Sequence, residues 1–344
     1  MTLVFGLAAG LWGLGWLMGA PHRLRWGMIA ALWFAVVLVN ATLAPESPLR
    51  VATGGDARVW IVLAAAFLVV MGYRAGLRRL RAGRVVAPVA SAAFSDSELD
   101  RYARHIMLRE IGGPGQRRLK DARVLVVGAG GLGSPAILYL AAAGVGTIGV
   151  IDDDTVEGSN LQRQIIHTDL RIGMPKVQSA LTAVQALNPF VTLRPYHRRL
   201  TEDIAVDLVA EYDLVLDGSD NFDTRYLVNR ACVTAGKPLI SAAMTQWEGQ
   251  ISLYHPTQGA PCYACIFPVR PAAGMVPSCA EAGVVAPLPG VIGSMMALEA
   301  VKHLTQAGET LAKRLLIHDA LFNETRVIKL APRLDCEVCG SAQH

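Results

Sequence analysis

A short apolar run followed by a glycine-rich turn constrains the fold of this chain more than any other feature. Residues 123–127 read RVLVV, the turn reads GAGGLG, and SPAILYLAAAG then has a helix-forming composition. This order of strand, turn and helix is typical of nucleotide-binding α/β proteins, because the glycines allow a close approach to phosphate and the helix N-terminus offers free N–H groups. We therefore expect a Rossmann-like doubly wound sheet. The glycines expected at the nucleotide are Gly128, Gly130, Gly131 and Gly133.

The next β-rich run ends in an acid. Residues 147–151 lead into Asp152, nineteen residues past Gly133, where a carboxylate can hydrogen-bond a ribose hydroxyl. The same pattern suits a nicotinamide- or flavin-dependent oxidoreductase, and a glycine turn without a ligand is the simplest alternative. The pattern thus predicts a nucleotide but not the reaction.

A polar cluster after this second strand favours ATP. It contains Asp154, Asn160, Gln162, Arg163, Gln164 and Lys176. Two cations beside a phosphate-binding turn suit a triphosphate, whose reaction builds negative charge on the α-phosphate and the leaving pyrophosphate. A dehydrogenase has no need of this cluster. Lys176 follows Pro175 in the first turn of a predicted helix, although a single lysine is most often a solvated surface residue.

A third buried-type run, residues 214–216, leads into the sequence DGSDN. Doubly wound sheets bind ligands at this carboxyl edge, so we expect Asp220 to hold Mg²⁺ and Asn221 to lie at the nucleotide. An acid at this position can instead cap the helix that begins near Asp223.

Four of the six cysteines form two C-x-x-C pairs, which indicates a metal site rather than a secreted disulfide framework. We expect Cys262, Cys265, Cys336 and Cys339 to bind one structural Zn²⁺ through a tetrahedral set of thiolates. The metal would join two distant segments of one domain. Four free or redox-active thiols are the alternative. A reducing compartment fits this cysteine usage.

The first 90 residues have a different composition. No charged residue interrupts residues 1–21, 26–45 or 59–73, and the first two stretches approach the roughly 20 apolar residues that span a bilayer. The third stretch is shorter. We expect two or three transmembrane helices in residues 1–76. A cleaved signal peptide fits less well, because a second apolar run follows almost at once. Buried core helices are the other alternative.

The arginines predict how this segment is oriented. Residues 1–90 hold nine Arg, no Lys and two acids, which leaves 23 basic and 26 acidic residues of the totals of 32 and 28. By the positive-inside rule, the arginines between the first two runs and those after the third face the cytoplasm. We expect an N-out topology at the cytoplasmic (inner) membrane. A basic linker follows at 77–94, and Ser95 or Asp96 caps the first helix of a cytoplasmic domain at 95–344.

Eight motifs together resemble the ThiF/HesA/MoeB family of ubiquitin-activating-enzyme-like adenylyltransferases. They are GAGGLGSP, SNLQRQ, GMPKV, LDGSDN, EGQISLY, PCYAC, CAEAGVVAPLPGVIGSMMALEAVK and CEVCG, and they run in order from about Ser95 to Gly340. Within the family the pattern is most similar to the molybdopterin-synthase type, and next to the thiamine-pathway type. The added N-terminal membrane segment departs from the family pattern. The short stretch after the last C-x-x-C leaves no room for the sulfur-transferase domain of some relatives.

The resemblance implies a set of residue roles. It implies Gly130 at the ATP turn, Asp152 at the ribose, Arg163 and Lys176 at the phosphates, and Asp220 at Mg²⁺. It also implies that Arg104 reaches the γ-phosphate region of a neighbouring subunit, which requires a homodimer.

The implied reaction is ATP-dependent adenylylation of the C-terminal Gly-Gly carboxylate of a ubiquitin-like sulfur-carrier protein. Cys279 lies outside both C-x-x-C pairs, in a Gly/Pro-rich stretch, and is a candidate for a covalent link to the activated carrier. An incidental loop cysteine is the alternative, and Cys232 is expected in the core. A catalytically silent scaffold that binds the carrier stays open. The near-neutral residues 91–344 carry no Lys/Arg stripe that predicts nucleic-acid binding.

Overall fold

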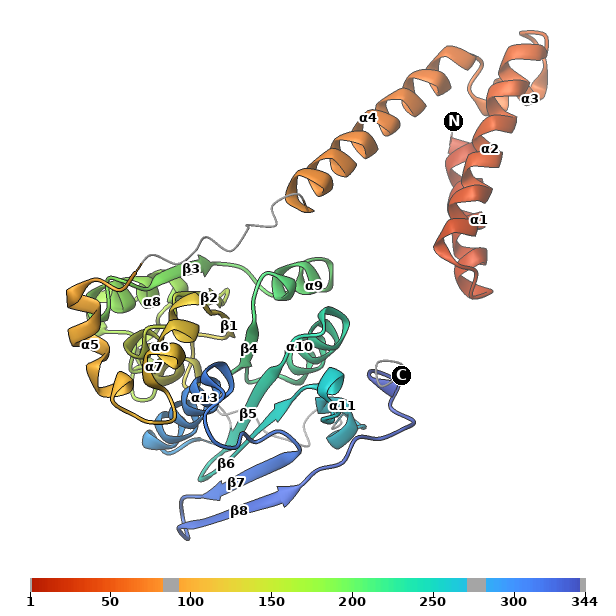
Figure 1. Ribbon diagram of the computed structural model, residues 1–344. Helices are drawn as coiled ribbons and strands as arrows, with labels where there is room; N and C mark the ends of the chain where they lie inside the picture. Colours follow the sequence, from red (N-terminus) through yellow and green to blue (C-terminus); the bar gives the residue numbers. More distant parts are fainter. Residues whose placement is uncertain (1, 83–92, 271–282, 341–344) are drawn as a thin grey trace. The chain divides into compact units, whose positions relative to one another are not determined.

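Two units make up the chain, and the computed structural model describes residues 2–82, 93–270 and 283–340 of them (Figure 1). The units are Met1–Val89 and Ala90–His344. The division lies within the segment that the sequence predicts as a linker. The predicted covalent residue Cys279 lies outside the described residues.

The N-terminal unit is helical throughout its described part. Its helices are α1 (Thr2–Leu17), α2 (His22–Thr42), α3 (Pro48–Thr53) and α4 (Ala57–Ala82). Two stretches have the length and apolar composition to cross a bilayer, Leu24–Thr42 and Pro48–Tyr73, each with a mean hydropathy of 1.7. α1, with 16 residues, is shorter. The third apolar run is the shortest of the three in the sequence, but it belongs to the longest of the described helices, because α4 continues beyond the run at both ends.

A small set of polar contacts ties α2, α3 and the start of α4 together. The side chain of Asn40 is buried, and its Nδ2 donates to Val36 O and Thr53 Oγ1, both at 2.8 Å. Trp60 Nε1 donates to Thr53 O at 2.9 Å, and Trp33 Nε1 donates to Trp60 O at 3.2 Å. Buried amide and indole groups are thereby paired inside a unit with little apolar core.

Eight strands form one mixed sheet in the described part of the second unit, in the order β3-β2-β1-β4-β5-β6-β7-β8. The strands are β1 (Arg123–Val127), β2 (Thr147–Ile151), β3 (Thr192–Tyr196), β4 (Leu214–Asp217), β5 (Leu239–Thr245), β6 (Glu248–Tyr254), β7 (Arg314–Asp319) and β8 (Glu324–Lys329). The first five are parallel, and β6, β7 and β8 extend the sheet in antiparallel pairs. The predicted Rossmann-like arrangement is confirmed for the parallel half, and the antiparallel half was not predicted.

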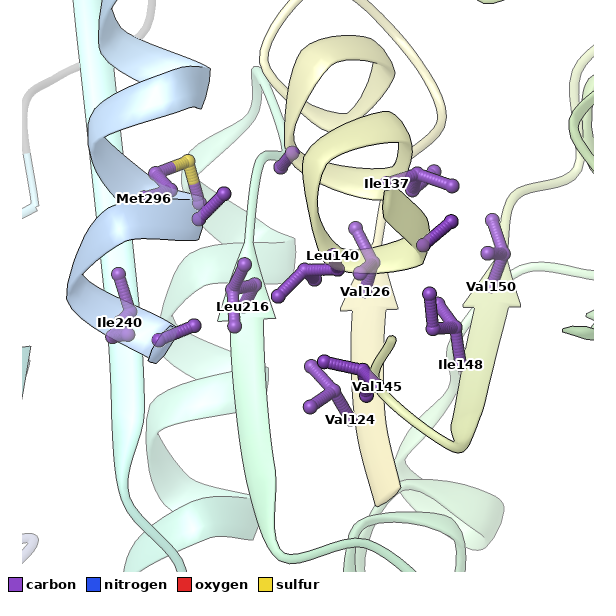
Figure 2. Packing of buried hydrophobic residues seen from close by; sticks show 14 of the residues in the cluster. Val124, Val126, Ile137, Leu140, Val145, Ile148, Val150, Leu216, Ile240 and Met296 are labelled. Carbon is purple, nitrogen blue, oxygen red and sulfur yellow. The ribbon is translucent and has the colours of Figure 1, made fainter. Parts of the chain in front are cut away.

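Both faces of the parallel half are buried. Alternate residues of β1 belong to different clusters: Val124 and Val126 pack with α7, α8 and α13, whereas Leu125 and Val127 pack with α9 and α10. Figure 2 shows the first cluster, with Ile137 of α7 and Met296 of α13 over the strands. The helices are α7 (Gly133–Ala143), α8 (Lys176–Leu187), α9 (Glu202–Ala210), α10 (Phe222–Ala235) and α13 (Pro287–Thr305). Such continuous apolar strands are typical of a sheet covered on both sides.

The second unit begins with a well-capped helix. α5 (Asp96–Ile106) has Ser95 as its N-cap in a capping box with Glu98, so the prediction of Ser95 is confirmed. α6 (Gly112–Asp121) follows, and the short α11 (Tyr263–Ile266) comes after the β5–β6 hairpin. Single turns of 3₁₀ helix occupy Gly158–Asn160, Asp169–Arg171 and Pro256–Gln258. The capping box satisfies backbone donors at the start of the first described helix of the second unit.

Candidate functional site

A cavity of about 740 Å³ opens at the carboxyl ends of β1, β2 and β4. This volume suits a small-molecule ligand, and the location is where doubly wound sheets bind nucleotides. Most residues that the sequence predicts at the nucleotide line it. They are Gly128, Gly130, Gly131, Asp152, Asp154, Arg163, Gln164, Lys176, Asp220 and Asn221.

The glycine turn leaves no room for side chains at its two ends. Gly128 has φ +93°, and a Cβ on Gly133 would lie 2.0 Å from Gly128 O. α7 can therefore begin directly against the turn. Gly130 and Gly131 line the cavity, and their N–H groups have no acceptor in the part of the chain that the structure describes, so two amide donors are free at this lining. Such free amides at a helix N-terminus suit an anionic ligand.

Asp152 is held by two backbone amides. Its Oδ2 accepts from Ala129 N at 2.7 Å and its Oδ1 accepts from Asp154 N at 2.8 Å. Burial raises the pKa of this carboxyl above its ordinary value, and the Ala129 amide opposes that rise. Each carboxylate oxygen keeps a further lone pair, so Asp152 can still accept a hydrogen bond from a ribose hydroxyl.

Lys176 is not a solvated surface lysine. Its side chain is 5% exposed, and its Nζ lies 2.7 Å from Oδ2 of Asp154, whose side chain is 64% exposed. Lys176 N also donates to Asp154 O at 3.0 Å. Since Lys176 lines the cavity and its one side-chain partner is largely solvated, it is available to a phosphate that approaches from solvent.

The turn before α8 positions two further polar groups. Arg163 donates from Nη2 to Asn160 Oδ1 at 3.1 Å, so Asn160, which does not line the cavity, supports Arg163. Gln164 is buried, and its Oε1 has no hydrogen-bond partner in the described residues. An unpaired buried acceptor is costly, and a bound ligand or water would satisfy it.

The loop after β4 decides between the two roles that the sequence left open for Asp220, which are binding of Mg²⁺ and capping of α10. Asn221 is the N-cap of α10, and its Oδ1 accepts from Thr224 N at 2.9 Å. Asp220 is exposed, lines the cavity and makes no side-chain hydrogen bond or ion pair within the described residues. The capping alternative for Asp220 is therefore excluded, and its carboxylate is available to a cation.

A buried ion pair orders this loop, and sequence reasoning missed it. Asp217 accepts at Oδ1 from Ser219 N (3.0 Å) and Ser219 Oγ (2.6 Å), and at Oδ2 from Ser241 Oγ (2.9 Å). Arg225, from α10, donates to Ser219 O and to Ala242 O, and its Nη1 lies 3.9 Å from Asp217 Oδ2. The one signal in the sequence is an acid that ends an apolar strand, followed by an arginine in the next helix.

Three more arginines, Arg198, Arg199 and Arg270, line the cavity without having been predicted. The first two follow β3, and Arg270 pairs with Asp223 at 2.5 Å. Arg198 and Arg199 offer a recognisable signal, because a basic pair directly after a parallel strand falls at the carboxyl edge of the sheet.

One wall of the cavity contains Tyr263 and Phe267. The four paired cysteines adjoin this wall, because Tyr263 lies between Cys262 and Cys265 in the sequence. The sulfur atoms of Cys262, Cys265, Cys336 and Cys339 all lie within 4.8 Å of one another. Sγ–Sγ separations of 3.8, 3.6 and 3.4 Å are close to the roughly 3.8 Å edge of a tetrahedron with about 2.3 Å metal–sulfur bonds. The donor set and its spacing fit a tetrahedral metal ion.

Other predicted residues lie away from this cavity. Arg104 is exposed on α5 and does not line it, so its contact with a partner subunit stays a prediction. Cys232 is buried in the core, as expected.

The second unit matches known proteins over most of its length. The family model described as ThiF family matches residues 102–338. The chain is 50% identical over 251 residues to the sulfur carrier protein adenylyltransferase of Thermus thermophilus, covering 72% of this chain and 93% of that protein. It is 48% identical over 244 residues to the SAMP-activating enzyme E1 of Haloferax volcanii, covering 71% and 90%.

A longer relative and a solved structure agree with these matches. The chain is 50% identical over 250 residues to the adenylyltransferase and sulfurtransferase MOCS3 of Bos taurus, covering 72% of this chain and 55% of that protein. The crystal structure of E. coli MccB with ATP has a TM-score of 0.61 at 23% identity, covering 72% and 75% of the two chains, and shows a shared fold. Since the family model spans most of the second unit, this chain belongs to the ThiF family.

Proposed function

We propose that this chain transfers an adenylyl group from ATP to the C-terminal carboxylate of a ubiquitin-like sulfur-carrier protein. The observation that carries the proposal is the cavity lined by two turn amides, by Lys176 and several arginines, and by Asp220, which has no side-chain partner among the described residues. The names of the relatives support it, because the Thermus thermophilus protein is called a sulfur carrier protein adenylyltransferase. The carrier is of the molybdopterin-synthase small-subunit type, with the thiamine-pathway carrier as the alternative for the same site.

The reaction needs charge neutralisation more than proton transfer. The carrier carboxylate attacks the α-phosphorus of ATP, a bond forms between carboxylate oxygen and phosphorus, and the bond to the β-phosphate oxygen breaks to release pyrophosphate. An α-carboxyl with a pKa of about 3.5 is already ionised at neutral pH, so no general base is required. Negative charge grows on the α-phosphate and on the leaving group, and preorganised donors stabilise it.

The described residues divide this work between them. Gly130 and Gly131 offer amide donors to the phosphates, and Asp152 offers an acceptor to the ribose. Arg163 and Lys176 stabilise the charge on the leaving pyrophosphate. Lys176 is desolvated before ATP arrives, because its side chain is already buried next to Asp154. When ATP binds, a phosphate oxygen replaces Asp154 as the partner of Lys176 or becomes a second partner.

Two metal ions fit the residues present. Asp220 would hold Mg²⁺, which adds positive charge at the phosphates. Cys262, Cys265, Cys336 and Cys339 would hold Zn²⁺, which has a structural role because four protein ligands leave no open position.

The active form is a homodimer in which Arg104 completes the partner subunit's site. This proposal is supported by the exposed position of Arg104 outside its own cavity. It is tested by mixing two inactive variants, Arg104→Ala and Lys176→Ala. In a mixed dimer one of the two sites is intact, so mixing should restore roughly a quarter of wild-type exchange. Mixed variants that stay inactive while forming dimers would exclude the shared site.

Residues 1–76 anchor the enzyme in the cytoplasmic membrane, residues 77–94 link the units, and the catalytic unit from residue 95 lies in the cytoplasm. Two stretches of spanning length and composition support the anchor.

The adenylylation itself is tested with a panel of purified carriers that end in Gly-Gly. Wild-type protein with ATP, Mg²⁺ and the correct carrier should exchange pyrophosphate into ATP, and omission of the carrier should abolish the exchange. Oxidation or reduction of a nicotinamide cofactor without any exchange would indicate an oxidoreductase. Carrier binding without exchange would indicate a scaffold.

A further inference from the structure

A buried histidine behind the glycine turn takes no part in the steps above. His167 is 5% exposed; its Nε2 lies 2.9 Å from Ala129 O and its Nδ1 lies 2.9 Å from Ser179 Oγ. A carbonyl oxygen can only accept, so Nε2 carries the proton. Burial lowers the pKa of this ring, and the nearby charges of Lys176 and Arg171 act in the same direction. The imidazole is therefore neutral, and the Ser179 hydroxyl donates to Nδ1.

Both backbone polar groups of Ala129 are hydrogen-bonded. Its carbonyl accepts from His167, and its N–H donates to Asp152 Oδ2 at 2.7 Å. The carbonyl of Ala129 and the N–H of Gly130 belong to the same peptide plane, and Gly130 and Gly131 line the cavity. The hydrogen bond from His167 therefore fixes the orientation of the peptide that carries the first of the two amide donors.

The other end of the histidine contacts the helix that carries the cation. Ser179 lies on α8 three residues after Lys176, and it is fully buried. Residues three apart lie on the same side of a helix. The ring thus connects the turn that offers amides to the helix that offers the ammonium.

We propose that His167 is a positioning residue for ATP, which keeps the amides of the glycine turn in register with Lys176 on α8. This inference rests on the proposed binding of ATP in the cavity. Without the ring, the buried carbonyl of Ala129 loses its partner, and the Ala129–Gly130 peptide rotates so that the carbonyl can accept from another donor. The phosphates would then meet misaligned amides.

The test uses full-length protein and four variants: His167→Ala, His167→Gln, Ser179→Ala and the control His255→Ala. The control removes another buried histidine, which does not line the cavity. For each protein we would measure the dissociation constant for ATP, the KM for ATP and kcat in pyrophosphate exchange, and the thermal midpoint.

His167→Ala should raise both the dissociation constant and the KM for ATP about tenfold or more, with a smaller change in kcat, because misaligned contacts weaken positioning. His167→Gln should stay within about threefold of wild type, since its amide can donate to Ala129 O as Nε2 does. Ser179→Ala, which loses one hydrogen bond, should weaken ATP binding about threefold. His255→Ala should bind ATP as wild type does.

Wild-type ATP affinity in folded His167→Ala would overturn the proposal, as would an equal loss in His167→Ala and His255→Ala. If His167→Ala does not fold, Ser179→Ala decides, and unchanged ATP affinity in that variant overturns it. Failure of the proposed function can be distinguished from failure of this proposal. In that case wild-type protein would bind ATP without pyrophosphate exchange, and the ATP dissociation constants of the variants could still be compared.

Discussion

The two units use apolar side chains in opposite ways. In the catalytic unit the apolar residues of β1 and β4 are buried between helices, as Val124, Leu125 and Leu216 illustrate. In the N-terminal unit, large apolar side chains point outward: Trp16 and Leu68 are each 68% exposed and Leu17 is 78% exposed. Large apolar patches facing water are rare in soluble monomers. The difference supports the proposed membrane anchor, because the catalytic unit covers its apolar side chains with its own helices while the N-terminal unit leaves many of them exposed.

Both units bury polar groups and pair them internally. The catalytic unit pairs buried Asp217 with Arg225, and it also keeps charged and amide groups at its cavity, where a ligand can meet them. The N-terminal unit pairs buried Asn40 with Thr53. Such internal pairing agrees with the proposed membrane anchor, because a polar group surrounded by hydrocarbon must be satisfied within the protein.

The sharpest test of this contrast is fractionation. The full chain should remain with membranes through salt and alkali washes, because spanning helices insert far more firmly than surface patches adhere. Residues 95–344 alone should be soluble and should catalyse pyrophosphate exchange. Full-length protein recovered in the soluble fraction would contradict the anchor, and an inactive but folded truncation would mean that the two units depend on each other.

The second test asks whether the activity depends on the charged residues at the cavity of the catalytic unit. Lys176→Ala, Arg163→Ala and Asp220→Ala should each lower pyrophosphate exchange about a hundredfold or more, the order expected when one charge partner of a transition state is removed. Lys237→Ala is a matched control, because Lys237 precedes the amino end of β5, away from the cavity. Near-normal exchange from all three folded site variants would exclude the assigned site.

Stability of the cavity wall provides the third test. Full-length protein should contain about one equivalent of zinc, and Cys339→Ala should lose it and lower the thermal midpoint of the catalytic unit by about 10 °C, since a few kcal/mol shifts a domain of this size by that much. Cys232→Ala removes a buried cysteine outside the cluster and should keep the metal. Less than about half an equivalent of zinc in folded wild-type protein would refute the metal site.

The smallest expected effect lies in the N-terminal unit. Asn40→Leu removes the hydrogen bonds to Val36 and Thr53 and should destabilise the helices in detergent by about 1 kcal/mol, the order measured for such bonds between membrane helices. Thr42→Val, at an exposed position of the same helix, is the control. Tryptophan fluorescence reports the change, because Trp33 and Trp60 adjoin the site. Lower exchange activity in Asn40→Leu would contradict the independence of the two units.

The sequence predicts the parallel half of the sheet well because local signals agree there. The runs 123–127 and 147–151 coincide with β1 and β2, and most predicted nucleotide residues line one cavity. β6, β7 and β8 were missed, although only the β6–β7 pairing joins segments far apart in sequence, while β5–β6 and β7–β8 are local hairpins. β8 is exposed along its whole length and carries no alternating apolar pattern. The roles of Arg225 and His167 were also not predictable, since each depends on backbone carbonyls that only the folded chain brings near.

The cysteine cluster has a consequence for the order in which the protein is made. Cys262 and Cys336 are 74 positions apart, and the helix α13 and the strands β7 and β8 are translated between them. The helices of the proposed anchor leave the ribosome first, while this cavity wall is still incomplete, because domains fold in order of synthesis. The cavity wall that contains Tyr263 and Phe267 is complete only after Cys336 and Cys339 have left the ribosome and joined the cysteine cluster. Insertion of the proposed anchor would thus precede the maturation of the catalytic site.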